Sequence, residues 1–263
     1  MHEGIYIAAS GGATQQKKLD IIANNLANVN TTGFKKDSIL FKEMMPPFTQ
    51  DTRLETSRNI LLPPDKSNKN VAYVGVNDFY TDHTAGAITK TGNPLDLALE
   101  GPGFFKVQTE QGIRYTRTGN FSLDQAGRLV SQNGNPILGE NDRPVEIDTT
   151  GGQITIDSNA NISIGRGLEN VPVGKLTLVE FDDTSSLVKE GNGIFRMTDP
   201  NRAELPAQKT RVRQGFVEAS NVNAIKEMTD MISTMRIFEA YQKMITAIDN
   251  VDSQAISNIG RVV

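Results

Sequence analysis

Apolar residues at both ends of this chain recur with the spacing of a helical seam. The first stripe alternates steps of three and four residues, with Gly12 and Gln15 as its weak points: Ile5, Ala8, Gly12, Gln15, Leu19, Ile22, Leu26 and Val29. The second lies in a run without proline or glycine between Gly215 and Gly260, and comprises Ile225, Met228, Ile232, Met235, Tyr241, Met244, Ile248 and Val251. As helices, residues 5–29 and 222–259 would be rods of roughly 37 and 57 Å. Neither can bury its stripe alone, so we expect each to pack on the other or on neighbouring molecules.

Turn signals follow the first predicted helix. Gly33 suits the left-handed conformation that ends many helices. Before it, Asn24, Asn25, Asn28 and Asn30 are an unusual density of poor helix formers. Either they are solvated positions at a fraying helix end, or their amides bond neighbouring backbone in a tightly packed assembly. The sequence leaves both interpretations open.

The next stretch predicts an extended arm. Residues 34–48 begin mixed and apolar and end near Pro46 and Pro47, and residues 49–70 are polar with a second proline pair. A structureless stretch of this length is unusual inside a compact domain, so an outlying arm is favoured, with a disordered linker as the alternative.

From about residue 71 to 216 the pattern is one of short strands between Gly and Asn turns. The predicted strands are residues 95–99, 104–107, 114–118, 120–123, 154–156, 162–164, 175–181 and 193–195. Strands at intervals of about ten residues indicate an antiparallel sandwich or a distorted barrel. Ser220 and Asn221 are candidate N-caps for the last helix.

These features together predict an α+β protein. Long N- and C-terminal helices would pair as a coiled-coil-like stem, with an antiparallel all-β domain inserted between them. The predicted parts are an N-terminal assembly helix at residues 1–30, an arm or intermediate domain at 31–94, the β domain at 95–216 and a C-terminal assembly helix at 217–263.

Composition argues against several classes of protein. A net charge of −4 without a basic block argues against nucleic acid as the main partner. The chain has no cysteine, which excludes thiol catalysis, disulfides and Cys-ligated zinc. The first residues lack the positive segment of a secretory signal, and no stretch is long and apolar enough for a transmembrane helix. If the protein leaves the cytoplasm, we expect a route that reads no ordinary cleavable signal.

No pattern predicts a catalytic, cofactor-binding or metal-binding residue. His2 and His83 are interpreted as isolated surface residues. Residues 101–103, Gly-Pro-Gly, predict a turn between strands, because neither a Lys-Ser/Thr pair nor a helix pattern follows. Asp142 and residues 182–183 lack the spacing of a calcium loop. Because carboxylates can pair in space, a β-rich carbohydrate hydrolase stays formally open.

Four segments resemble motifs of the bacterial flagellar rod and hook proteins. They are ANNLANVNTTGFK at residues 23–35, LALEGPGFF at 97–105, YTRTGNF at 115–121 and GFVEASNVN at 215–223. Their order matches the family and they span nearly the whole chain. TGNPLD at residues 91–96 and EMTDMI at 227–232 look most like proximal-rod members. The distal-rod paralogue is the alternative; it usually carries a longer polar insertion and a different stretch where this chain has VGVND at 74–78.

The resemblance implies a structural subunit of the flagellar basal-body rod that catalyses no reaction and holds no cofactor. The terminal helices would form the inner layer of a hollow tube, with the β domain outside. Implied partners are other rod subunits, copies of the same chain and the flagellar type III export apparatus, with no nucleic acid and no insertion into a bilayer. The implied location is the rod within the cell envelope, in the periplasm.

Carried over by position onto the stripes and motifs, the resemblance implies the residues of the assembly interface, and it implies that Asn24, Asn25, Asn28 and Gly33 lie at the joint with the arm. These are Ile5, Leu19, Ile22, Asn24, Asn25, Leu26, Asn28, Val29, Gly33, Phe34, Asn221, Asn223, Ile225, Met228, Ile232, Met235, Phe238, Tyr241, Ile245 and Ile248. A secreted adhesin or ligand-binding β domain is the remaining class, and such a protein would tolerate loss of the helices.

Overall fold

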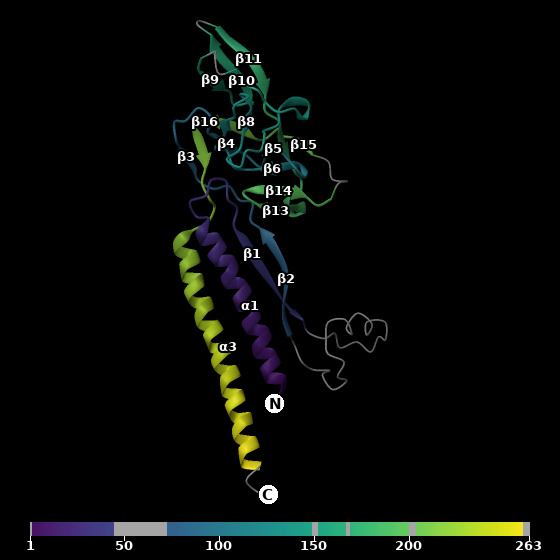
Figure 1. Ribbon diagram of the computed structural model, residues 1–263, viewed down its shortest axis with the longest axis vertical. Helices are drawn as coiled ribbons and strands as arrows, with labels where there is room; N and C mark the ends of the chain where they lie inside the picture. Colours follow the sequence, from purple (N-terminus) through teal and green to yellow (C-terminus); the bar gives the residue numbers. More distant parts are fainter. Residues whose placement is uncertain (1, 45–72, 149–151, 167–168, 200–203, 260–263) are drawn as a thin grey trace. The chain divides into compact units, whose positions relative to one another are not determined.

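The chain is α+β, with a helix at each end and antiparallel strands between them (Figure 1). The computed structural model describes residues 2–44, 73–148, 152–166, 169–199 and 204–259. The fold divides into two compact units. The first consists of Met1–Asn24, Ile39–Phe79 and Ile225–Val263, and the second of Asn25–Ser38 and Tyr80–Ala224. The chain therefore passes from one unit to the other four times, at residues 24/25, 38/39, 79/80 and 224/225.

The first unit contains both terminal helices and most of a two-stranded sheet. Helix α1 spans His2–Ala27 and helix α3 spans Ala224–Ile259. The sheet pairs β1 (Asp37–Met44) with β2 (Tyr73–Thr81). Both helices that the sequence predicts are present, and the 36 residues of α3 contain neither proline nor glycine to interrupt them. The polar stretch of the predicted arm, residues 49–70, lies outside the described residues, whereas residues 31–44 and 73–94 of the predicted arm or intermediate domain are described.

The second unit is built from short antiparallel strands, as the turn spacing predicts. A six-stranded sheet has the order β13-β14-β6-β5-β12-β15, and a three-stranded sheet the order β11-β10-β9. Three further pairs are β16-β4, β17-β3 and β7-β8. The strands are β3 (Ile88–Lys90), β4 (Leu97–Glu100), β5 (Phe104–Thr109), β6 (Gly112–Thr116), β7 (Ser122–Leu123), β8 (Leu129–Val130), β9 (Ile154–Ile156), β10 (Asn161–Arg166), β11 (Glu169–Lys175), β12 (Leu178–Glu180), β13 (Leu187–Gly191), β14 (Ile194–Met197), β15 (Leu205–Pro206), β16 (Arg211–Gln214) and β17 (Phe216–Glu218).

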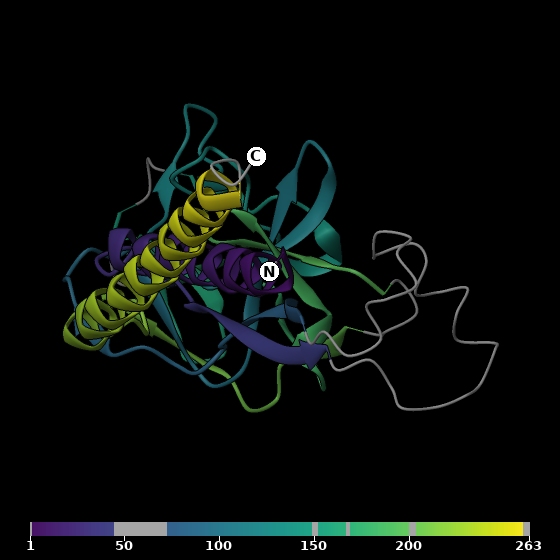
Figure 2. The same ribbon diagram turned by 90° about the horizontal axis from the view of Figure 1, so that it is seen from below.

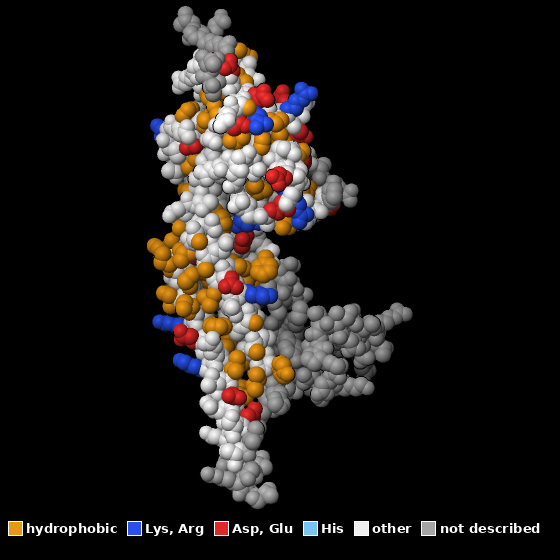
Figure 3. All heavy atoms as spheres, in the orientation of Figure 1, with side chains coloured by type: hydrophobic (Ala, Val, Ile, Leu, Met, Phe, Trp, Pro, Cys, Tyr) orange, Lys and Arg blue, Asp and Glu red, His pale blue; other side chains and the backbone are white. Residues whose placement is uncertain are grey.

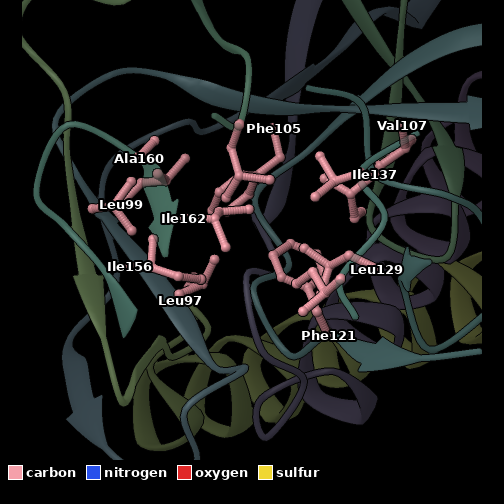
Figure 4. Packing of buried hydrophobic residues seen from close by; sticks show 14 of the residues in the cluster. Leu97, Leu99, Phe105, Val107, Phe121, Leu129, Ile137, Ile156, Ala160 and Ile162 are labelled. Carbon is pink, nitrogen blue, oxygen red and sulfur yellow. The ribbon is translucent and has the colours of Figure 1, made fainter. Parts of the chain in front are cut away.

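The core of this unit lies on both faces of β5. Successive side chains of a strand point to opposite faces, so Phe104 and Phe105, both fully buried, enter different clusters. The larger cluster packs Phe105 edge-on against Phe121, with ring centroids 5.0 Å apart (Figure 4). The smaller cluster contains Phe104, Tyr115, Val179, Phe181, Leu187 and Phe195. Burying one such side chain contributes roughly 1.5–3 kcal/mol, so the two clusters hold the strands together.

One predicted strand is two strands in the structure. Residues 175–181 read as a single strand, but β11 ends at Lys175 and β12 begins at Leu178. Between them the backbone N–H of Leu176 donates to Ala160 O, and that of Thr177 donates to Leu138 O. The chain crosses from the three-stranded sheet to the six-stranded one at this point, which alternation of apolar residues cannot reveal.

Two turn predictions are confirmed. The Gly-Pro-Gly segment connects β4 to β5, and Gly101 has a φ of +130°. Gly33 has a φ of +66° in the turn after α1, the left-handed conformation that glycine adopts most readily. The predicted N-caps are wrong, because α3 begins only at Ala224 and the side chain of Asn221 is engaged elsewhere.

Candidate assembly surface and joint

The predicted face of α1 is the buried face of that helix. Ala8 and Ile22 are buried, and Ile5, Gln15, Leu19, Leu26 and Val29 are half-buried. Gly11 forms a glycine notch against α3: a Cβ added to Gly11 would lie 2.6 Å from two ring carbons of Tyr241, whereas one added to Gly12 would lie at 3.7 Å or more from α3. The two helices run antiparallel within the first unit (Figures 1 and 2), and a Cβ on Gly4 would lie 3.5 Å from Ile248 Cδ1.

The predicted stripe of α3 is not one face. Tyr241 and Ile248 of the stripe are half-buried together with Phe238 and Ile245, whereas the first half of the stripe is exposed, as are Met244 and Val251 in the second half. The step from Met235 to Tyr241 is six residues, which at about 100° per residue displaces the second half by about 120° around the helix. Apolar residues thus occupy two faces, and the spacing within each half hid the change of phase.

We call the exposed half the open face of α3. Its members are Ile225, Met228, Ile232 and Met235, with exposures of 78, 50, 55 and 48 %. Hydrophobic side chains gather along α3 in Figure 3. Scattered apolar residues are ordinary on a protein surface, but four on successive turns of one helix form a continuous patch of the kind found at interaction sites. Met244 and Val251, farther along α3, are also exposed.

In the asparagine-rich end of α1, Asn25 is buried and hydrogen-bonded rather than solvated at a fraying helix end. Asn25 is 2 % exposed. Its Nδ2 donates to Asp37 O at 2.9 Å, and its Oδ1 accepts from Asp37 N at 3.0 Å. This pair of bonds fits the second interpretation of the asparagines, except that the bonded backbone belongs to the same chain. Asn24 and Asn30 are exposed, and Asn28 Oδ1 accepts from the Thr31 hydroxyl at 3.2 Å.

Asn221 occupies the corresponding place before α3. Its Nδ2 donates to Asp82 O at 2.8 Å, and its Oδ1 accepts from Lys36 N at 2.8 Å. Its backbone N–H donates to Phe34 O at 3.3 Å. Asn221 is therefore a tie between chain segments rather than a helix cap. Phe34 is buried and Asn223 is exposed.

Beneath these asparagines lies a buried ionic cluster that the sequence did not single out. Lys35 and Glu218 are each 1 % exposed, and Lys35 Nζ lies 2.5 Å from Glu218 Oε1. Arg117 Nη1 lies 3.3 Å from Glu218 Oε2, and Arg117 Nη2 donates to Gly101 O at 2.7 Å. Burial lowers the pKa of Lys35 and of Arg117, and Glu218 opposes the shift in both. Removing Glu218 would leave two buried cations unpaired.

His83 is not the isolated surface residue that the sequence predicts. It is partly buried, with ring centroids 5.8 Å from Phe104 and 5.3 Å from Phe195. Its Nδ1 is buried without a hydrogen-bond partner among the described residues. Burial, followed by the charges of Lys35 and Arg117, lowers the pKa of His83 to about 4. The imidazole is therefore neutral at neutral pH.

We call the bonded residues around the end of α1 the joint: Asn25, Gly33, Lys35, Asp37, Arg117, Lys189, Glu218 and Asn221. The sequence contains a signal for part of this joint only. Asn25, Gly33 and Lys35 all lie in the 23–35 motif, but Glu218 and Lys189 contact Lys35 from sequence positions far away, and Arg117 pairs with Glu218. No local pattern reports such long-range pairs. In the described ranges no three His, Cys, Asp or Glu side chains come together in a way that could hold a metal ion. Neither described helix is long and apolar enough to cross a membrane.

Comparison with protein-family models gives three matches, one at each end and one in the β domain. Residues 5–35 match the model described as Flagella basal body rod protein. Residues 98–166 match the Flagellar hook protein FlgE/F/G D1 domain, and residues 213–258 match the Flagellar basal body rod FlgEFG protein C-terminal. The matched ranges contain the buried face of α1, the open face of α3 and most of the joint.

Full-length relatives agree with these matches. The chain is 34% identical to the flagellar basal-body rod protein FlgF of Caulobacter vibrioides, over 100% of both chains. It is 32% identical to the flagellar basal-body rod protein FlgG of Bacillus subtilis, over 98% of this chain and 99% of that relative. With the FlgG of Buchnera aphidicola from Acyrthosiphon pisum, identity is 34% over 95% of this chain and 96% of that relative.

Proposed function

Because this chain belongs to the flagellar basal-body rod protein family, we propose that it is a proximal-rod subunit that assembles through its terminal helices. The family is one of structural proteins rather than enzymes, and its members are located in the basal-body rod. Membership also implies assembly with other flagellar rod proteins. Further partners in this proposal are copies of the chain itself and the flagellar type III export apparatus.

The open face of α3 carries the proposal of assembly. Its four apolar side chains remain between 48 and 78 % exposed in the single chain, although they lie on consecutive turns of one helix. Burial against neighbouring subunits would remove this surface from water, which is favourable by about 25 cal/mol per Å² of apolar area. In this proposal the predicted interface residues of α3 act in two sets: residues 225–235 between subunits and residues 238–248 toward α1.

The stem in this proposal is the pairing of α1 with α3. The glycine notch supports it, because Gly11 leaves room for the Tyr241 ring where any larger residue would collide. The half-buried Ile5, Leu19 and Ile248 extend the same apolar face on either side. The stem would be a coiled-coil-like pair in the assembled rod.

Two short motifs favour the proximal over the distal rod. TGNPLD at residues 91–96 and EMTDMI at 227–232 resemble proximal-rod members, and the full-length match to the Caulobacter FlgF is consistent with them. The distal rod is the second candidate, because FlgG relatives match at similar identity and over nearly the same length.

Cross-linking of purified hook–basal bodies from the source bacterium, followed by mass spectrometry, tests the proposal. Lys226 and Lys243 are exposed on α3 and are the reporting residues. Cross-links from them to other rod proteins are expected, and the identity of those neighbours separates the proximal from the distal position. Absence of the chain from purified particles would contradict a rod role in either position.

A further inference from the structure

The residues beside all four crossings between the units are bonded to one another inside the second unit. Asn25, Asp37, Thr81 and Asn221 lie within a few residues of the crossings at 24/25, 38/39, 79/80 and 224/225 respectively. All four belong to the second unit, although they come from distant parts of the sequence. We call these residues, together with Lys189, the clamp.

Asp37 is the centre of the clamp. Its backbone N–H and C=O both bond the Asn25 amide, at 3.0 and 2.9 Å. Its Oδ1 accepts from the Thr81 hydroxyl at 2.8 Å, and its Oδ2 accepts from Lys189 Nζ at 2.9 Å. One residue thus contacts the end of α1, the end of β2 and strand β13.

Asn221 adds the segment that leads to α3. Its amide bonds Lys36 N and Asp82 O, each at 2.8 Å. Asp82 N in turn donates to Lys36 O at 2.9 Å. The segments after α1, after β2 and before α3 are therefore joined by a closed set of hydrogen bonds, in which neither oxygen nor nitrogen of the Asn221 amide is left unpaired.

Lys189 is the one member of the clamp that does not lie beside a crossing between the two units. It comes from β13 in the large sheet, and its side chain is 15 % exposed. Its Nζ donates to Lys35 O at 2.6 Å, pairs with Asp37 and lies 3.8 Å from the centroid of the Phe34 ring. An ammonium with a carboxylate, a carbonyl and an aromatic face around it is held in a defined position. Lys189 thereby fastens the crossing segments to the β domain.

We propose that the clamp resists torque between the chain segments it joins, with Asp37 and Lys189 as positioning residues that stop the four crossings from moving independently. The inference rests on the proposed role as a rod subunit, because a rod subunit transmits torque. Hydrogen bonds to charged groups in a partly buried site resist opening more than exposed ion pairs do. Loss of the ammonium should loosen the joint without disturbing the hydrophobic clusters.

The variant Lys189→Met tests the clamp, with Lys209→Met as its matched control because Lys209 is exposed. Amide hydrogen exchange on the full-length chain should accelerate about tenfold at residues 34–38 and 80–84 in Lys189→Met. Exchange in β5 and β6 should stay as in the unaltered chain. Cells carrying Lys189→Met as the only copy should swim normally in dilute medium but more slowly than cells carrying Lys209→Met in viscous medium, where torque is high.

Two outcomes overturn the inference. One is equal exchange at residues 34–38 in Lys189→Met and Lys209→Met, and the other is equal swimming of the two strains under high viscosity. A separate strain without the gene distinguishes failure of the rod role itself: if it swims in dilute medium, the proposed function fails whatever the clamp does. A milder variant, Asp37→Asn, keeps the side-chain shape and should give the same load dependence.

Discussion

Gly33 shows how a single backbone conformation supports the joint. Its φ is +66°, and an added Cβ would lie 2.6 Å from backbone atoms of Arg117 and Thr118. We expect Gly33→Ala to lower the free energy of unfolding of the second unit by about 2–4 kcal/mol, from left-handed strain and the clash with a backbone that cannot yield. Urea unfolding followed by circular dichroism measures this change.

Gly92 provides the control for that variant. Its φ is +80°, but no atom lies within 4 Å of an added Cβ. Gly92→Ala should therefore incur only the conformational cost, about 1 kcal/mol. Equal losses in the two variants would mean that the contact between Gly33 and the 117–118 backbone has no energetic importance.

His83 makes the stability of the second unit depend on pH. Its pKa is lowered to about 4 in the folded chain by burial and by Lys35 and Arg117. Between the unfolded value near 6.5 and the folded value the unfolded chain binds more protons, so stability is lost as the pH falls through this window. Replacement by Phe, which suits the contacts with Phe104 and Phe195, should remove a loss on the order of 2 kcal/mol at pH 5.

Urea unfolding of the unaltered chain and of His83→Phe at pH 7, 6 and 5 checks this expectation. The difference between the two chains isolates the imidazole, because nearby carboxylates titrate in both. The free energy of unfolding should fall more steeply with decreasing pH in the unaltered chain. Parallel curves would show that the buried imidazole is not the group responsible.

The sequence predicts the positions of helices and strands better than it predicts which of their faces are buried. Helix and strand positions follow from spacing and turn residues, and both terminal helices and the antiparallel strands are confirmed. The apolar positions of α3 move to another face of the helix between Met235 and Tyr241. The sequence pattern does not reveal this, because each half keeps a helical spacing and only contacts show which face is buried. Likewise, Leu176 and Thr177 alternate like strand residues, but their backbone N–H groups donate to Ala160 O and Leu138 O, and the chain passes there from β11 in one sheet to β12 in another.

The two faces of α3 predict separable effects of substitution. Ile232 is 55 % exposed, so Ile232→Lys should leave unfolding of the single chain within about 0.5 kcal/mol of the unaltered value. In an assembled rod the ammonium would lie in an apolar contact that does not compensate its desolvation, so motility should be lost. Ser233→Lys, at the neighbouring exposed position, is the control and should swim.

Leu26→Lys extends the comparison to the end of α1. Leu26 is half-buried, so this variant should block assembly while the strands of the β domain stay folded. Circular dichroism melting of purified chains reports whether the β domain stays folded, and swimming reports whether the rod assembles.

For the other variant, if Ile232→Lys swims as Ser233→Lys does, the open face is not an interface between subunits.

The whole molecule depends on contacts that link distant parts of the sequence, and these limit what the sequence can predict. Lys35 pairs with Glu218, and Lys189 reaches Asp37, across separations that no periodic pattern encodes. The resemblance located Asn25 and Gly33 at a joint, yet gave no indication that Asp37, Arg117 and Lys189 complete it. Division into two units crossed four times also follows from the fold rather than from changes in composition.

The division into two units leads to a prediction about the free subunit. The second unit has two hydrophobic clusters of its own, whereas α3 presents an open apolar face to water. Isolated helices are marginal in water, and a long helix is stabilised mainly by packing. In the monomer, amides of α3 should therefore exchange faster than those of β5 and β6 by several orders of magnitude, and become protected in assembled rods. Amide exchange on both samples measures this, with the β strands as the internal reference. Strong protection along the whole of α3 in the free chain would mean that the helix folds before assembly, and that the rod receives preformed stems instead of completing them.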